Sequence, residues 1–299
     1  MPTTYQCPVS PEERSTICHP LQRLIRFEAY GILFILAGIF GALLTLVPPD
    51  RELLVLLVFI AASSAFGFVI NDISDMALDA RAVNPRNPLA DGSLTCRTAQ
   101  KVSALFLLIS VACMVLMPPH LLLIELAVLF VFVTYSFFIE AKNLAGFDLV
   151  YHALFPALYG LLGYMLYHPP DLTGLVFFVL LGIFGAVGEL CNEIRDLEKD
   201  RSERKNTVVL IGERRGFYLL VALMITAFAG IGIFSLSEPG FFWLLPFVPL
   251  GFILIHPVWK AMNEPAYHQK FVDVINTRAI FLAVVMLAVY GLVRFTGSA

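Results

Sequence analysis

The sequence predicts an all-α integral membrane protein with nine transmembrane helices. Three observations support this fold class: the composition, nine apolar stretches and a one-sided distribution of basic residues. Of its 299 residues, 59% are hydrophobic and 14% are charged, whereas a soluble globular domain usually carries about 25% charged residues. So few charges cannot cover a water-facing surface, and a bilayer is the expected solvent. The net charge of −3 favours neither a nucleic-acid partner nor a polybasic segment.

Nine apolar stretches are long enough to cross a membrane, which takes about 20 residues of helix. They are 21–47, 53–75, 98–117, 121–139, 147–167, 172–194, 216–236, 241–262 and 272–295. Proline pairs at 48–49, 118–119 and 169–170, with Pro239-Gly240, break the chain at four of the turns between them. We therefore expect residues 21–299 to form a single transmembrane domain.

Residues 1–20 are polar, with prolines at 2, 8, 11 and 20. They lack the basic, apolar and small-residue layout of a cleaved signal peptide, so we expect a polar arm that is mobile or lies on the membrane surface. The five cysteines are scattered without a CxxC pair, which argues against a disulfide framework or a zinc site.

The basic residues predict the orientation. Of the 20 Lys and Arg residues, only Arg51 and Arg294 fall on one side of the predicted layout. The positive-inside rule places the other side, with the N-terminus, in the cytoplasm. An odd number of spans then places the C-terminus outside.

Small residues indicate where helices are expected to touch, because they let membrane helices approach closely. They are Gly38 and Gly41 in the first stretch, Gly160 and Gly163 in the fifth, and Gly182, Gly185 and Gly188 in the sixth.

Two acidic motifs of the same form end the second and sixth stretches. The first motif reads NDISDMALD at 71–79, and the second motif reads NEIRDLEKD at 192–200, beginning 121 residues later. A basic loop follows each copy. Because the two stretches are four spans apart, they cross the membrane in the same direction. Both motifs are therefore expected at the cytoplasmic face.

Each motif is expected to present a stripe of oxygen ligands, because helical residues four apart share a face. The stripes are Asn71, Asp75 and Asp79, and Asn192, Asp196 and Asp200. Stacked carboxylates repel one another, so positive charge must compensate them. Mg²⁺ fits this role, since it prefers hard oxygen ligands and is commonly shared between carboxylates and substrate phosphates.

Two facing stripes with such ions predict a site for a diphosphate. Basic side chains near the motifs are expected to take the remaining phosphate oxygens. They are Arg86, Lys142, Lys199, Arg204 and Lys205.

Other interpretations of the acidic residues are helix caps or interfacial salt bridges, because polar groups near a membrane surface cost little. Two copies in register weigh against this. CDP-alcohol phosphotransferases also carry aspartates and Mg²⁺, but in one continuous run. A cation-coupled transporter could use the acids as an ion site, although many transporters have inverted repeats and sites at the bilayer midplane. This repeat is parallel and lies at one face.

With these motifs, the sequence resembles the UbiA family of intramembrane prenyltransferases. The first motif matches the family's first aspartate-rich signature, and Asn87-Pro88-Leu89-x-x-Gly92 is similar to the loop that follows it. Asp196-x-x-x-Asp200, with Arg204-Lys205-x-Thr207 and Gly212, matches the second signature and its loop. The resemblance implies helices around a central cavity, short cytoplasmic cap elements and a side opening toward lipid. It also implies Mg²⁺-dependent transfer of a prenyl group from a prenyl diphosphate.

The resemblance carries roles onto particular residues. Catalysis is expected from Asp72, Asp75, Asp196 and Asp200, and the metal ligands are completed by Asn71, Asp79 and Asn192. Glu193 stands where the first motif has Asp72, which leaves it outside the expected ligand set. Tyr135, ahead of Lys142, resembles a family position near the diphosphate.

The acceptor side is expected deeper in the membrane. Glu189 lies inside the sixth stretch, and an acid within a membrane span is a functional candidate by default. Arg26, Asp148 and Tyr151, at the cytoplasmic ends of the first and fifth stretches, are further candidates. Within the family, the acceptor is an aromatic or lipid molecule of quinone or ether-lipid biosynthesis.

Overall fold

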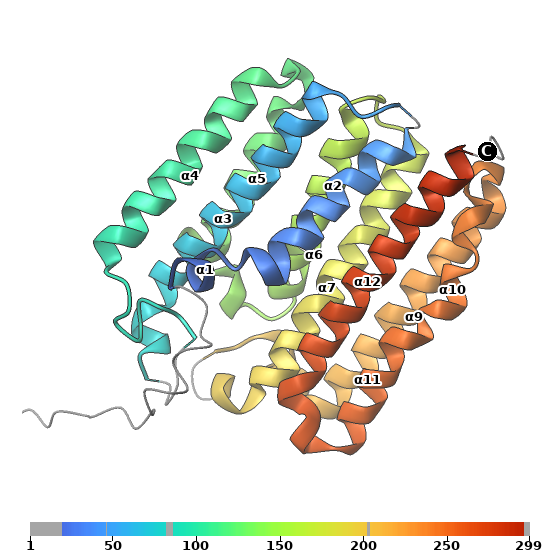
Figure 1. Cartoon of the computed structure of the whole chain (residues 1–299). Helices are drawn as coiled ribbons and strands as arrows, with labels where there is room; N and C mark the ends of the chain where they lie inside the picture. Colours follow the sequence, from blue (N-terminus) through green and yellow to red (C-terminus); the bar gives the residue numbers. More distant parts are fainter. Residues whose placement is uncertain (1–19, 46, 82–85, 202–203, 296–299) are drawn as a thin grey trace, which may run out of the picture.

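The computed structural model describes residues 20–45, 47–81, 86–201 and 204–295, and within these ranges the chain forms helices and no strand. Figure 1 shows the long helices lying side by side with roughly aligned axes, from α4 at one edge to α9 and α11 at the other. The predicted all-α class is confirmed. The polar arm predicted at 1–20 lies outside the described residues except for Pro20, which begins α1.

The first half of the chain, up to the start of the second motif helix, contains both described π-helices. Its elements are α1 (Pro20–Ile25), π-helix η2 (Phe27–Gly31), α2 (Ile32–Leu44), α3 (Arg51–Asp79), α4 (Cys96–Leu116), η3 (Pro119–Leu121), α5 (Leu122–Val133), π-helix η4 (Thr134–Phe138), η5 (Ala141–Asn143) and α6 (Phe147–Met165). The second half contains α7 (Leu172–Asp200), α8 (Thr207–Ile211), α9 (Glu213–Ser237), η6 (Pro239–Leu244), α10 (Phe247–Leu250), α11 (Phe252–Asn263), η7 (Pro265–Tyr267) and α12 (His268–Phe295).

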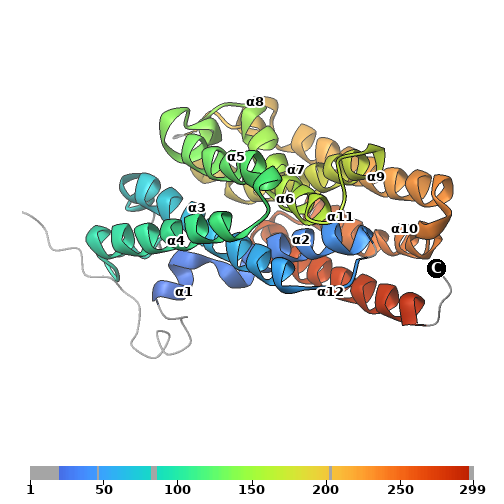
Figure 2. The same cartoon turned by 90° about the horizontal axis from the view of Figure 1, so that it is seen from above.

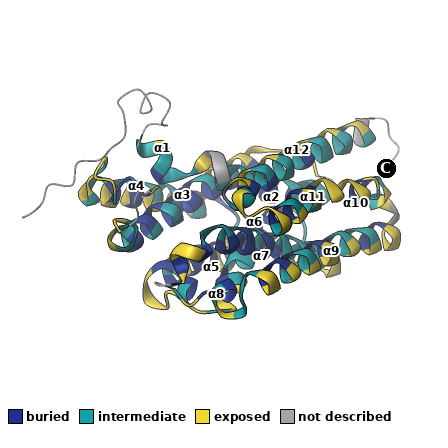
Figure 3. Ribbon diagram, turned by 90° about the horizontal axis from the view of Figure 1, so that it is seen from below, coloured by how far each residue is buried: buried dark blue, intermediate teal, exposed yellow. Residues whose placement is uncertain are grey.

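Seven helical segments in the described chain are long and apolar enough to cross a membrane. They are Arg51–Asp79, Cys96–Leu116, Pro119–Phe138, Leu172–Asp200, Glu213–Ser237, Gly240–Asn263 and Lys270–Val293. Large apolar side chains on them point outward, such as Val115 and Leu123, which are 80% and 78% exposed, and Figure 3 shows exposed residues on the outer faces of the bundle. An apolar outer surface suits lipid, so the prediction of a multi-pass membrane protein is confirmed.

The two other predicted spans correspond to α2 and α6, which pack against each other inside the bundle, as Figure 2 shows from above. Glycines let them touch: a Cβ on Gly41 would lie 2.0 Å from the carbonyl oxygen of Gly160, and one on Gly163 would lie 2.0 Å from that of Gly38. The predicted contact role of these glycines is confirmed. Gly185 meets α6 in the same way, whereas no neighbour lies within 4 Å of a Cβ on Gly188.

The two motif helices, α3 and α7, begin with matched aspartate caps. Asp50 accepts hydrogen bonds from the backbone N–H groups of Glu52 and Leu53, and Asp171 accepts one from that of Gly174. Tyr167 donates to Asp50 and Tyr164 donates to Asp171, so both helices start at the same end of the bundle. They therefore run parallel and deliver both motifs to the opposite end, called the motif end below.

The apolar core falls into two main clusters that follow the two halves of the chain. One is built on α2 to α6 and includes fully buried Phe59 and Tyr159, whose hydroxyl lies 2.8 Å from that of Ser63. The other joins α7, α9, α11 and α12, with Phe271 fully buried. The packing of α6 against α7 connects the two clusters and holds the motif helices in one frame.

We expect Gly163→Leu to destabilise the protein by about 1–3 kcal/mol or more, because overpacking a tight contact forces backbone shifts. The added side chain meets backbone atoms of α2, so the two helices must separate. Thermal unfolding in detergent measures the effect. Gly291→Leu in α12 is the control, since no described residue of another element lies within 4 Å of its Cβ position. Equal melting temperatures for the two variants would contradict this account of the α2–α6 contact.

Candidate active site

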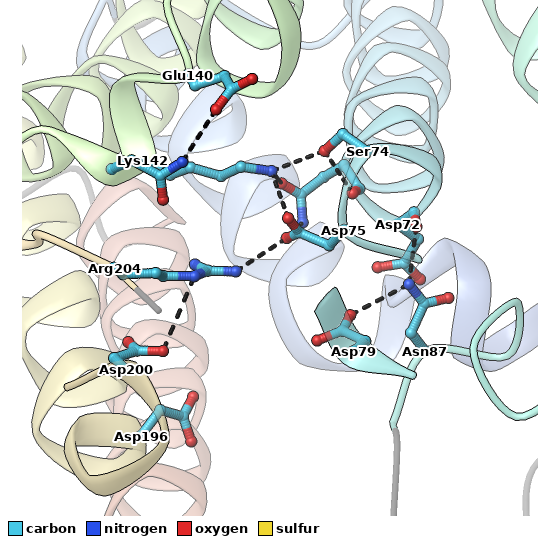
Figure 4. A network of polar contacts seen from close by, with 12 residues as sticks. Asp72, Ser74, Asp75, Asp79, Asn87, Glu140, Lys142, Asp196, Asp200 and Arg204 are labelled. Carbon is cyan, nitrogen blue, oxygen red and sulfur yellow. Dashed lines mark hydrogen bonds and ion pairs between the residues drawn. The ribbon is translucent and has the colours of Figure 1, made fainter. Parts of the chain in front are cut away.

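The two motifs face a common group of cations at the motif end of the bundle. Figure 4 shows Asp75 between Lys142 and Arg204, with Asp196 and Asp200 on the far side of Arg204 and Asp72 and Asp79 beyond Asp75. The motif helices carry the acids. The cations come mainly from the turn at η5 and from the loop before α8.

Asp75 is the most heavily bonded of these acids. Lys142 Nζ donates to its Oδ1 at 2.7 Å, and Arg204 Nη2 donates to its Oδ2 at 3.1 Å. Lys142 also donates to Ser74 Oγ at 2.7 Å, and the Asn71 amide lies 3.4 Å from Asp75 Oδ2. Asp75 and Lys142 are 7% and 5% exposed. A buried ion pair of this kind is stable only when hydrogen bonds satisfy its atoms, and here they do.

Each remaining aspartate predicted as a metal ligand also has a cationic partner. Arg26 donates to Asp72. Lys199 lies 2.9 Å from Asp79 and so links the two motif helices. Arg195 pairs with Asp196 at 2.7 Å, and Arg204 approaches Asp200 at 3.8 Å. The acidic stripes are therefore neutralised by side chains of the chain itself.

This pairing changes the charge of the site and the basicity of its cations. Burial lowers the pKa of Lys142 against the opposing effect of Asp75. Burial would also lower the pKa of Arg204, but Asp75 and Asp200 outweigh it and raise the pKa above its ordinary value.

Among the described residues, no three His, Cys, Asp or Glu side chains converge on one point that could hold a metal ion. The predicted ligands lie in two separate rows instead.

A second set of contacts, which the sequence analysis did not predict, holds the start of α8. The backbone N–H groups of Thr207 and Val208 donate to Asp148 and Glu193 at 2.6 and 2.8 Å. The Thr207 hydroxyl donates to Asp148 Oδ1 at 2.6 Å. Asp148 was expected on the acceptor side, but it is fully buried against Thr207. Glu193, the departure from the all-aspartate motif, likewise holds this loop.

A third polar cluster lies deeper in the membrane, one turn of α7 before the second motif. His152 Nε2 lies 3.0 Å from Glu189 Oε2, and Asn192 Nδ2 lies 3.4 Å from the same oxygen. Tyr30, from π-helix η2, donates to Asn192 Oδ1 at 3.0 Å. The Tyr135 ring, from π-helix η4, meets the edge of the His152 ring with centroids 5.1 Å apart. Both described π-helices thus deliver a tyrosine here, in keeping with the frequent occurrence of π-helices at functional sites.

The other predicted residues lie at the margin. Tyr151 is buried with its ring 6.1 Å from that of Tyr135. Arg86 is exposed, and its carbonyl accepts a hydrogen bond from Arg23. Lys205 is exposed and lines a surface pocket of about 530 Å³ with Phe147 and Leu210 rather than the space between the motifs.

The fold and the site together define a membrane-embedded helical bundle with paired acidic motifs and cations at one end. The sequence model of the UbiA prenyltransferase family matches residues 31–285 of this chain. The chain therefore belongs to this family and is a prenyltransferase.

Solved structures share this fold across nearly the whole chain. A UbiA homolog from Archaeoglobus fulgidus bound to GPP and Mg²⁺ superposes with a TM-score of 0.70 at 19% identity, covering 90% of this chain and 99% of that one. The apo structure of a UbiA homolog from Aeropyrum pernix K1 gives 0.74 at 19% identity, covering 89% and 99%. At these identities the likeness establishes the fold alone.

In sequence, the chain is similar to a digeranylgeranylglyceryl phosphate synthase from Haloquadratum walsbyi (strain DSM 16790 / HBSQ001). The two are 25% identical over 224 residues, which cover 74% of this chain and 76% of the relative.

We expect Thr207→Val to loosen the loop before α8, because it leaves buried Asp148 and the Gly146 N–H without their hydroxyl partner. A buried polar group without a partner costs about 1–3 kcal/mol. Amide hydrogen exchange over residues 204–212 measures the loss of protection, and Thr207→Ser, which keeps the hydroxyl, should restore it. Unchanged exchange in the valine variant would show that this bond does not hold the loop.

Proposed function

We propose that the protein transfers a prenyl group from a prenyl diphosphate to a lipophilic acceptor in a reaction that depends on Mg²⁺. The observation that carries the proposal is the pairing of two parallel acidic rows with cations, among them the buried Lys142, at one end of a membrane bundle. Solved relatives bound to GPP with Mg²⁺ and to DMAPP with Mg²⁺ agree with this chemistry.

The charge balance of the site explains why metal ions should enter with the substrate. The aspartates already have cationic partners, so an added diphosphate needs further positive charge. The available donors are carboxylate and amide oxygens, the ligands Mg²⁺ prefers. Asp72 Oδ2 is buried and has no hydrogen-bond partner among the described residues, which fits an oxygen left for an ion.

In this proposal the metal ligands are Asn71, Asp72, Asp75, Asp79, Asn192, Asp196 and Asp200. When bound, Mg²⁺ acts as a Lewis acid on the diphosphate leaving group. Lys142 and Arg204 turn from Asp75 toward the phosphate oxygens, because the buried Lys142 and the half-buried Arg204 are both donors within reach of that carboxylate. Lys199 and Arg86 complete the cationic rim around them.

The acceptor side is proposed at the cluster of His152, Glu189 and Tyr135. These side chains lie on the membrane side of the second motif, where the first carbon of the prenyl chain would follow the diphosphate. The Tyr135 ring can stabilise positive charge on that carbon, as aromatic faces do for cations. Glu189 and His152 are the polar groups there that can orient an acceptor. Arg26 pairs with Asp72, and Asp148 holds the α8 loop, so we assign neither Arg26 nor Asp148 to the acceptor.

The proposed topology has nine crossings: the seven candidate spans, α2 and α6. Support comes from the parallel course of α3 and α7, which requires an odd number of crossings between them, and three crossings by α4, α5 and α6 meet this condition. The motif end is assigned to the cytoplasm by the excess of basic residues. Residues 21–299 then form one domain around a central cavity, with α8 and the loop after α3 as cytoplasmic caps.

For the acceptor we favour a prenylated glyceryl phosphate of ether-lipid biosynthesis over an aromatic quinone precursor. The support is the likeness in sequence to a digeranylgeranylglyceryl phosphate synthase. Membership of a prenyltransferase family does not support the alternative hypothesis of a cation-coupled transporter.

We expect Asp75→Asn and Asp196→Asn each to reduce prenyl transfer by at least about 10²-fold, because each removes a charged ligand and leaves its cationic partners without their counter-charge. The measurement is Mg²⁺-dependent product formation in nanodiscs from labelled prenyl diphosphates of several lengths, with lipid and aromatic acceptors offered separately. Glu198→Gln is the control, since this neighbouring acid of α7 is exposed and pairs with Arg201. A folded wild-type protein that consumes no prenyl diphosphate would overturn the proposal.

We expect Glu189→Gln to lower turnover at limiting acceptor by about 10-fold, since the loss of a buried polar contact costs about 1–3 kcal/mol. The KM for the prenyl diphosphate should stay unchanged. Glu125→Gln provides a matched control, because Glu125 is a buried acid of α5 ten residues before Tyr135 and thus about 15 Å along the helix axis. An equal rise in the KM of both substrates in the Glu189 variant would count against an acceptor role.

A further inference from the structure

The internal repeat continues past the motifs into side-chain contacts that their spacing does not reveal. In each half of the chain, a buried asparagine from the following loop donates its amide to the last aspartate of the motif. The pairs are Asn87 with Asp79 and Asn206 with Asp200. The asparagines are 119 residues apart, not 121, so an alignment of the motifs does not match them.

The first contact ties the loop after α3 to the first motif. Asn87 Nδ2 donates to Asp79 Oδ2 at 3.2 Å and to the backbone carbonyl of Asp72 at 2.7 Å. Asn87 Oδ1 accepts from the backbone N–H of Leu89 at 2.9 Å. Asn87 is 1% exposed. One side chain thus fixes both a carboxylate of the motif and the turn that follows, as Figure 4 shows for the two aspartates.

The second contact repeats this arrangement. Asn206 Nδ2 donates to Asp200 Oδ2 at 2.8 Å, and Asn206 Oδ1 accepts from the backbone N–H of Val209 at 2.9 Å as the N-cap of α8. Asn206 and Asp200 are 2% and 6% exposed. The amide and the carbonyl therefore have separate tasks: the carbonyl caps the backbone, and the amide holds the aspartate.

The amide also fixes the direction of the other aspartate oxygen. The oxygen of Asp79 that the amide does not hold, Oδ1, lies 2.9 Å from Lys199. The corresponding oxygen of Asp200 lies 3.8 Å from Arg204. A carboxylate with one oxygen held by an amide cannot rotate freely. Its other oxygen is kept pointing toward the cations between the motifs, where a metal ion would compete for it.

We propose that Asn87 and Asn206 are matched positioning residues, each of which orients the last carboxylate of its motif for metal binding and ties to it the loop that follows. This inference rests on the proposed Mg²⁺-dependent function. Hydrogen-bond partners of metal ligands typically change metal affinity or activity by about 10- to 100-fold when they are removed. The Asn206 contact is shorter and its aspartate more deeply buried, so its loss has the larger effect.

The test separates the amide from the cap. Asn87→Ser and Asn206→Ser each keep an oxygen that can accept the backbone N–H, since serine and asparagine are similar N-caps, but lose the amide that reaches the aspartate. Asn263→Ser is the control, because within the described part of the chain the Asn263 amide bonds only the carbonyl of Trp259 in α11. The melting temperature of each variant without metal ensures that folded proteins are compared.

Two readouts are needed. The first is the Mg²⁺ concentration at half-maximal turnover, which we expect to rise about 10-fold or more in Asn206→Ser, with kcat at saturating Mg²⁺ less affected. The second does not depend on turnover: Mn²⁺ is titrated into the purified enzyme with inorganic diphosphate, and free Mn²⁺ is followed by electron paramagnetic resonance. We expect weaker Mn²⁺ binding in both serine variants and unchanged binding in Asn263→Ser.

The outcomes are distinct for the two hypotheses. Wild-type Mn²⁺ binding in both serine variants would overturn the positioning role while leaving the proposed reaction intact. A wild-type protein with neither Mn²⁺ binding nor turnover would overturn the proposed function itself. If Asn206→Ser does not fold, Asn87→Ser at the less buried aspartate decides the question alone.

Discussion

Asp75 is held between Lys142 and Arg204, and this buried arrangement joins three parts of the chain that are distant in sequence. Asp75 lies one turn before the end of one motif helix, Lys142 comes from the turn between α5 and α6, and Arg204 comes from the loop after the other motif helix. Removing one partner of such a pair leaves an uncompensated buried charge, which costs about 3–5 kcal/mol. The geometry of the whole motif end therefore depends on all three staying together.

The same pairing determines how the site can respond to a ligand. Cations that already neutralise the acids can exchange carboxylate oxygens for phosphate oxygens with little net change in the number of charged hydrogen bonds. The carboxylates released in that exchange then need a new counter-charge, which a divalent cation can supply. A self-neutralised site thus couples anion binding to metal binding, because neither ligand is well compensated without the other. Both cations that would exchange partners lie outside the long helices, Lys142 in the short turn η5 and Arg204 in the loop before α8.

Much of this arrangement could be predicted from the sequence. The contacts that could not be predicted were missed for physical reasons. The spacing of Asp75 and Asp196 predicted matched acidic rows because helical periodicity acts within a few residues. The contact between Asp148 and Thr207 was not predicted, because the two residues are 59 positions apart in the sequence and no local pattern indicates it. The breaks in the first and fourth spans were missed because π-helices depend on local packing. By contrast, the matched caps Asp50 and Asp171 keep the 121-residue offset and follow identical proline pairs, so this signal was available.

The two halves of the repeat match most closely from the aspartate caps to the ends of the two motif helices. From the caps to the last motif aspartates, α3 and α7 have the same length of 29 residues. At the second position of the motifs the halves differ: Asp72 pairs with Arg26, whereas Glu193, at the matching position, accepts a hydrogen bond from the backbone N–H of Val208 in α8. In both carboxylates the second oxygen is buried without a hydrogen-bond partner among the described residues. Glu193 is one methylene longer than Asp72, and this length lets its carboxylate bond the α8 backbone. The second motif therefore lacks the shorter carboxylate that Asp72 provides in the first motif. The second half therefore has an added task, because Glu193 holds the loop that carries Arg204 to Asp75.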